Sequence, residues 1–197
     1  DGFRMDSISF ISKPRKFEDA PLEDSKEYGA YYYGSANGPH IHEYLQEMNR
    51  EVLSKYDVIS IGETPHTSAK EARLFVEPER HELDMVFQFE HMHVDYGEYG
   101  RYSDVSFKMS DLRNSMSSWQ NLSWNSNYLG NHDQPRIVSR FGNDSQYRKE
   151  SAKMLAMASL LQKGTPFIFQ GEEIGMTNLH IKQIDELKDL EAHNIYN

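Results

Sequence analysis

The chain opens on Asp1-Gly-Phe-Arg-Met-Asp6, and this stretch decides how the rest of the sequence is interpreted. It begins an apolar run from Phe3 to Phe10, which predicts a buried strand. Two later apolar runs lead directly into polar clusters that carry Glu63 and Asp133. Because the carboxyl ends of parallel strands meet at one edge of a sheet, Asp6, Glu63 and Asp133 are candidates for one shared site.

Short apolar runs alternate with amphipathic stretches along the chain. The alternation predicts an α/β protein with right-handed crossovers and a parallel sheet, either an arc of a barrel or a doubly wound sheet. Ser110 is expected to cap one helix, and Gly164 is expected to follow another in the left-handed conformation. The predicted strands are 3–10, 58–62, 83–89, 126–130 and 166–170, and the predicted helices are 41–55, 110–119 and 147–163.

The composition excludes several classes of function. The 197 residues include no Cys, which rules out disulfides, thiolate catalysis and Cys-ligated zinc. Lys and Arg number 21 against 31 Asp and Glu, so the formal net charge is −10. Because an acidic chain is a poor counterion for phosphate groups, we expect neither a nucleic-acid partner nor a membrane partner.

The acidic residues suggest a particular chemistry. Arg4 lies two residues before Asp6, a spacing that places both side chains on one face of a strand and would keep Asp6 ionised. Glu63, without such a partner, is expected to stay protonated. One ionised and one protonated carboxyl group, about 5–5.5 Å apart, are what retaining glycoside hydrolysis needs. Any one of these acids alone is more often a helix cap or a loop salt bridge, so the hypothesis depends on their combination.

Short motifs around these residues carry a resemblance to a known family. Gly2-Phe-Arg-Met-Asp6, Gly62-Glu63 and Asn131-His-Asp133 resemble signature segments of glycoside hydrolase family 13, the α-amylase superfamily. The longer strings at 130–142 and 163–178 resemble its oligo-1,6-glucosidase and α-glucosidase branch. The likeness extends from residue 1 to about residue 190.

The resemblance implies a TIM (β/α)8 barrel, of which residues 1–197 would form strands four to eight of the catalytic domain. Neither end of the chain has the sequence of a natural terminus, so we expect a piece of a longer protein. The N-terminal half of the barrel and the C-terminal β domain of the family would then be absent. An incomplete barrel exposes an open sheet edge and half a core, so we expect the isolated piece to be inactive.

The resemblance also implies a role for each site residue. Asp6 would be the nucleophile and Glu63 the general acid/base. Asp133 would bind sugar hydroxyls at subsite −1, and His132 would hydrogen-bond the same sugar. Arg4 would fix Asp6 in place. No cofactor is implied within this piece, and calcium, if the full-length enzyme binds it, would lie outside residues 1–197.

The implied activity is release of glucose from short α-glucosides, isomalto- or malto-oligosaccharides, through a covalent glycosyl-enzyme. The expected partner is a small oligosaccharide, and the expected location is the cytoplasm of a bacterium. Ser7, expected near subsite +1, leaves the linkage open, because Val there resembles α-1,6 enzymes and Ala or Thr resembles α-1,4 enzymes. Sucrose isomerases or transglucosidases of the same family stay open too, although Val94–Asp104 holds one Arg where the isomerases carry an Arg/Asp-rich loop. A non-catalytic sugar-binding barrel is the third possibility.

Smaller signals carry less weight. His91 and His93 would point together on a strand, but no third ligand follows at a recognisable spacing, so no metal site is predicted. Tyr31–Tyr33 is equally compatible with sugar stacking and with packing on the barrel. Glu172 and Glu173 are expected to shape the rim of the site without reacting.

Overall fold

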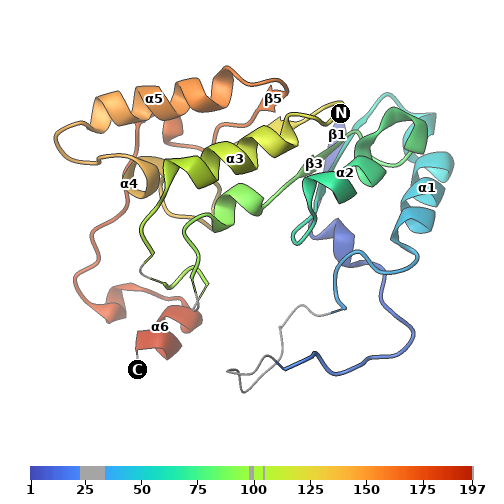
Figure 1. Ribbon diagram of the computed structural model, residues 1–197, viewed down its shortest axis with the longest axis horizontal. Helices are drawn as coiled ribbons and strands as arrows, with labels where there is room; N and C mark the ends of the chain where they lie inside the picture. The colour runs from blue at the N-terminus through green and yellow to red at the C-terminus, as the bar shows by residue number, and fades with distance from the viewer. Residues whose placement is uncertain (23–33, 98–99, 104, 197) are drawn as a thin grey trace. The chain divides into compact units, whose positions relative to one another are not determined.

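The computed structural model describes residues 1–22, 34–97, 100–103 and 105–196 (Figure 1). The chain divides into two compact units. The first unit comprises Asp1–Leu129 with Ser159–Phe167, and the second comprises Gly130–Ala158 with Ile168–Asn197. In the part of the chain that is described, no helix is long and apolar enough to cross a membrane.

All five strands of the described residues belong to the first unit. Its elements are β1 (Gly2–Met5), η1 (Ile8–Phe10), α1 (Ile41–Glu51), η2 (Leu53–Lys55), β2 (Ile59–Glu63), α2 (Ala69–Val76), η3 (Pro78–Arg80), β3 (Met85–Phe87), η4 (Glu90–His93), α3 (Met109–Trp119), β4 (Ser126–Asn127) and β5 (Thr165–Pro166). Helix α5 (Arg148–Leu160) spans the boundary between the units. The second unit also contains α4 (Ile137–Phe141), η5 (Glu172–Ile174), η6 (Ile184–Glu186) and α6 (Leu190–Tyr196).

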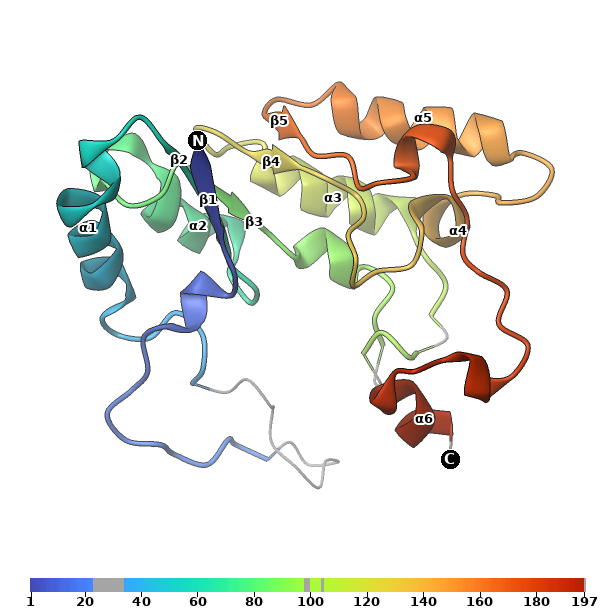
Figure 2. The same cartoon turned by 180° about the vertical axis from the view of Figure 1, so that it is seen from behind.

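The strands pair in parallel, as the alternating sequence pattern predicts. The first sheet has the order β1-β2-β3, and a second sheet consists of β4 and β5 (Figure 2). In the register between β1 and β2, Met5 lies opposite Gly62. Glu63 is therefore the last residue of β2, and Asp6 directly follows β1 at the same end of the sheet.

Several elements are shorter than the sequence pattern indicates. The strand predicted at 3–10 ends at Met5, because Ser7 adopts a left-handed conformation, with φ 43° and ψ 38°, that turns the chain into η1. Only the first residue of the run predicted at 166–170 belongs to β5. The expected cap Ser110 lies inside α3, whose N-cap is Lys108. Gly164 has a positive φ, 125°, but α5 ends at Leu160, so this glycine does not directly follow the helix as expected.

A hydrophobic core packs helices onto the first sheet. The large fully buried side chains at its centre include Phe75 of α2, Leu45 of α1 and Trp119 of α3. The indole Nε1 of Trp119 donates to Glu90 Oε2 at 2.5 Å. The remaining core members are Ile8, Ile41, Ala72, Val76, Leu83, Val86 and Leu122. Met5 of β1 packs against this core and Ile8 of η1 belongs to it, so the turn that carries Asp6 and Ser7 is anchored on both sides.

Candidate active site

The carboxyl ends of β1 and β2 bring four of the predicted site residues together. Arg4 lies on β1, Asp6 and Ser7 form the turn that follows it, and Glu63 ends β2. Arg4 Nη1 contacts Asp6 Oδ1 at 2.5 Å, and Arg4 Nη2 contacts Glu63 Oε1 at 2.9 Å. The backbone N–H of Ser7 donates to Glu63 Oε2 at 3.0 Å. Parallel pairing thus converts a sequence separation of 56 residues into direct contact.

The position of Arg4 corrects one expectation. The sequence suggested that Arg4 would hold Asp6 and that Glu63 would have no cationic partner. In the structure the two ends of one guanidinium contact one carboxyl group each. The rigid, planar fork of Arg allows this, whereas the single ammonium of Lys would not present two separate donors in that geometry.

Glu63 is nevertheless biased toward its protonated form. Burial raises the pKa of Glu63 above its usual range, and a hydrogen bond with Asp6 and the charge of Asp6 add to this effect. The Ser7 N–H and the charge of Arg4 lower the pKa, but they do not cancel the rise. The Glu63 side chain is 11 % exposed and that of Asp6 is 79 % exposed. The two carboxyl groups therefore differ in environment in the direction that acid and nucleophile require.

The other two predicted sugar-binding residues belong to the second unit. The backbone N–H of Asp133 donates to Asn131 Oδ1 at 2.9 Å, and His132 Nε2 lies 3.5 Å from Asp133 Oδ2. Both side chains are more than half exposed. Asp133 belongs to the second unit whereas Asp6 and Glu63 belong to the first, so their expected meeting stays a prediction.

Glu172 is a site candidate to which sequence reasoning assigned only a rim position. Burial raises the pKa of Glu172 to about 7, and repulsion from Glu173 adds to the shift. Its Oε1 atom is buried with no hydrogen-bond partner in the described part of the chain. A Cβ added to Gly130 would lie 2.6 Å from this oxygen, so Glu172 packs closely on the backbone that leads to His132 and Asp133. No motif signals this, because burial arises from packing.

We expect the Glu172→Gln variant of the full-length protein to lose part of the pH dependence of its stability. Because the folded-state pKa of about 7 is raised, the folded protein binds more protons, and stability falls as the pH rises from about 4.5 through 7. The slope attributable to Glu172 should stay below about 1.4 kcal/mol per pH unit, since solvent screens this half-buried group. Urea unfolding between pH 5 and 8 measures it, with the exposed Asp144→Asn as control. Equal slopes in the wild type and Glu172→Gln would contradict the prediction.

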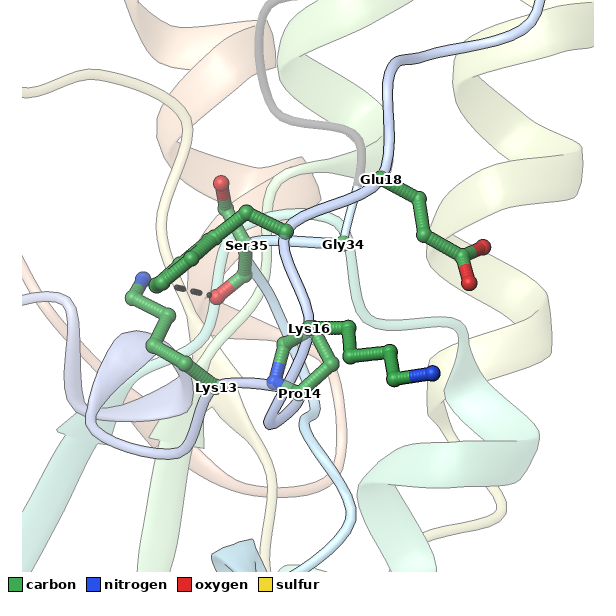
Figure 3. Close-up of a pocket in the computed structure, with 7 residues that line it drawn as sticks. Lys13, Pro14, Lys16, Glu18, Gly34 and Ser35 are labelled. Atoms are coloured by element: carbon green, nitrogen blue, oxygen red, sulfur yellow. Dashed lines mark hydrogen bonds between the residues drawn. The ribbon is translucent and has the colours of Figure 1, made fainter.

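Two hollows lie in loops that follow the strands. One, of about 230 Å³, is lined by residues that follow β2 and β3, among them His66, Phe89 and His93. The sequence offered no signal for His66, whose pKa burial lowers. The other, of about 480 Å³, lies in the loop after η1 (Figure 3). There Lys13 Nζ donates to the carbonyl of Ser35 at 3.1 Å, while the Lys16 side chain extends in the opposite direction, so the two ammonium groups do not converge on one point.

The remaining predictions from the sequence concern the pair His91 and His93 and the segment Tyr31–Tyr33. His91 and His93 lie in the 3-10 helix η4, where the alternation that would align them on a strand does not apply. Their rings pack on Tyr128 and Tyr96 respectively, each with 4.6 Å between centroids. The described residues contain no group of three or more His, Asp or Glu side chains that could hold a metal ion. Tyr31–Tyr33 lies outside the described residues.

Parallel strands with an acid pair at their carboxyl ends are the arrangement expected of an α/β domain with a carboxyl-based site. A family profile described as "Alpha amylase, catalytic domain" matches residues 1–196, and the chain belongs to this family. The solved structures that it resembles are TIM barrels.

Curated relatives and solved structures match the chain over nearly its whole length, and several of the relatives are glucosidases. The chain is 52 % identical, over its whole length, to oligo-1,6-glucosidases of Parageobacillus thermoglucosidasius and Bacillus cereus, and it spans 36 % of the length of each. The crystal structure of a trehalose-6-phosphate hydrolase from Bacillus licheniformis is similar to all of this chain, which covers 35 % of it, with a TM-score of 0.89 and 43 % identity. An isomaltulose synthase from Klebsiella sp. LX3 matches 99 % of the chain, over 35 % of its own length, with a TM-score of 0.89 and 38 % identity.

Proposed function

We propose that the protein to which this chain belongs is a retaining glycoside hydrolase that releases glucose from short α-glucosides. The observation that carries the proposal is the environment of the acid pair. Glu63 is buried and biased toward protonation, whereas Asp6 is exposed and ion-paired with Arg4. Retaining glycosidases use one protonated and one ionised carboxyl group in this way. The identity to oligo-1,6-glucosidases supports the substrate class.

In the proposed mechanism an Asp6 oxygen attacks the anomeric carbon while Glu63 transfers its proton to the departing glycosidic oxygen. Water then attacks the anomeric carbon of the glycosyl-enzyme, Glu63 accepts a proton from it, and the ester bond to Asp6 breaks. The mechanism needs a separation of about 5–5.5 Å between the two groups, which is wider than the hydrogen-bond contact of Asp6 with Glu63. Asp6, the exposed partner, must therefore turn away from Glu63 to admit the sugar.

The proposal extends to the barrel strands and to the residues that would bind the sugar. Residues 1–197 would supply strands four to eight of the barrel within a partial catalytic domain. Asp133 and His132, from the second unit, would bind the hydroxyl groups of the glucose that Asp6 attacks. Ser7 would lie near the departing sugar, and the enzyme would act in the cytoplasm on small oligosaccharides without a nucleic-acid partner.

Two alternative activities have support among the relatives. An isomaltulose synthase and a trehalulose synthase are structurally similar to the chain, which favours transfer within sucrose as the second candidate. The segment Val94–Asp104 with its one Arg favours hydrolysis instead. A trehalose-6-phosphate hydrolase of Bacillus subtilis is 42 % identical to the chain. Against a phosphate-binding role, the two lysines of the loop pocket diverge (Figure 3).

A panel of disaccharides tests the proposal with the full-length protein. We expect release of glucose from isomaltose or maltose to be fastest, and sucrose, trehalose and trehalose 6-phosphate to be poor substrates. Chromatography of the products separates hydrolysis from isomerisation, because an isomerase converts sucrose to another disaccharide. Rapid conversion of sucrose or trehalose 6-phosphate, with isomaltose and maltose left intact, would replace the proposal by one of the alternatives.

A further inference from the structure

The turn after β1 places Ser7 directly against the buried acid. Ser7 has a left-handed backbone, and its carbonyl accepts a hydrogen bond from the N–H of Phe10 at 2.9 Å. This conformation directs the Ser7 N–H toward Glu63 Oε2 at 3.0 Å, with the hydroxyl Oγ 3.5 Å from the same oxygen. Ser7 thus contacts Glu63 through both its backbone and its side chain.

The partners of Glu63 differ in the protonation state that they favour. The Arg4 guanidinium and the Ser7 N–H can only donate, so they stabilise the carboxylate. Asp6 favours protonated Glu63, because two adjacent carboxylates repel each other. A hydroxyl group can both donate and accept. The Ser7 hydroxyl can therefore donate to ionised Glu63 and accept from protonated Glu63 without any movement of the backbone.

We propose that Ser7 is a positioning residue for Glu63, whose hydroxyl holds this carboxyl group in place through both of its protonation states. The inference rests on the proposed function, in which Glu63 gives up a proton in the first step and regains one in the second. It assigns Ser7 a role toward the acid that is separate from any contact with the departing sugar. Among the described residues, the ionisable groups that act on Glu63 are Arg4 and Asp6.

Four forms of the full-length enzyme test the role, with Ser, Ala, Thr or Val at position 7. Thr keeps the hydroxyl and Val has nearly the same shape without it, so the Thr and Val variants form a matched pair. A hydrogen bond donated to a charged group is the stronger kind, so loss of the hydroxyl should raise the pKa of Glu63. We expect the basic limb of the kcat/KM profile to move up by about 0.5 pH units in Ser7→Ala and Ser7→Val, and kcat to fall roughly threefold to tenfold.

The expected pattern follows the hydroxyl group and is independent of side-chain size. Ser7→Thr should retain the wild-type limb, and Ser9→Ala, in the same turn but bonded to the Pro65 carbonyl, should leave the limb unchanged. If the limb is the same in all four forms while the isomaltose-to-maltose ratio changes with side-chain size, Ser7 acts on the sugar alone and the inference is wrong. An inactive wild-type enzyme would instead contradict the proposed function itself.

Discussion

The Asp6→Asn variant of the full-length protein is expected to lose at least about 10⁴-fold in kcat while it still binds sugar. The amide is a poor nucleophile, so no glycosyl-enzyme forms. It is close in size to the carboxylate and keeps an oxygen that can accept from Arg4 Nη1, which lies 2.5 Å from Asp6 Oδ1 in the wild type. Initial rates on isomaltose and maltose measure the loss, and calorimetric titration with the same sugars measures the retained binding.

The control for this variant is Asp57→Asn, which alters an exposed Asp outside the site. It should keep wild-type rates, and both variants should unfold at the wild-type temperature. Substantial hydrolysis by Asp6→Asn would remove Asp6 from the role of nucleophile. A wild-type protein that binds these sugars without hydrolysing them would favour the non-catalytic alternative.

The Glu63→Gln variant is expected to lose activity in a way that depends on the leaving group. An amide cannot protonate the glycosidic oxygen, so kcat/KM for isomaltose should fall by about 10²–10⁴-fold. In an aryl glucoside of a strongly acidic phenol, the phenolate leaves without protonation. The kcat/KM for this substrate should therefore fall by less than about tenfold. The comparison separates the acid from the nucleophile, because loss of the nucleophile slows both substrates alike.

The second step of the reaction provides an independent check. Without Glu63 to accept a proton from water, the glycosyl-enzyme should accumulate on the aryl glucoside and be visible as a burst and as a mass increase of one hexose. Azide, which needs no base to attack, should restore kcat and yield glucosyl azide. The exposed Glu79→Gln serves as control. Equal losses on isomaltose and the aryl glucoside, with no effect of azide, would contradict the acid/base role.

Some features of the candidate site follow from the spacing of residues along the sequence. The apolar runs predicted the end of β2 to within one residue and so placed Glu63 at the carboxyl end of a parallel strand, whereas the end of β1 was expected at Phe10 and lies at Met5. The contact of Arg4 with Asp6 follows from their two-residue separation. By contrast, the run to Phe10 concealed a left-handed residue at Ser7, because hydrophobic periodicity carries no information about the sign of φ.

The pKa of Glu63 shifts in the expected direction, but the cause differs from the one that the sequence suggested. The sequence suggested that Glu63 lacked a cation, whereas Arg4 contacts it at 2.9 Å and burial raises its pKa nonetheless. Burial of Glu172 could not be predicted from the sequence either, since nothing in its neighbourhood in the sequence indicates that one of its oxygens is buried against Gly130. Desolvation depends on every atom that surrounds a group, and most of those atoms come from distant segments.

The sequence by itself determined the parallel α/β pattern, the family motifs and the identity of the acids at the strand ends, because these properties depend on residues a few positions apart. Only the tertiary structure decided that one guanidinium bridges Asp6 and Glu63, that Ser7 turns its N–H and hydroxyl toward Glu63, and that one oxygen of the half-buried Glu172 is shielded from solvent. The physical reason is that hydrogen-bond partners and solvent exclusion are set by the packing of segments that are far apart along the chain.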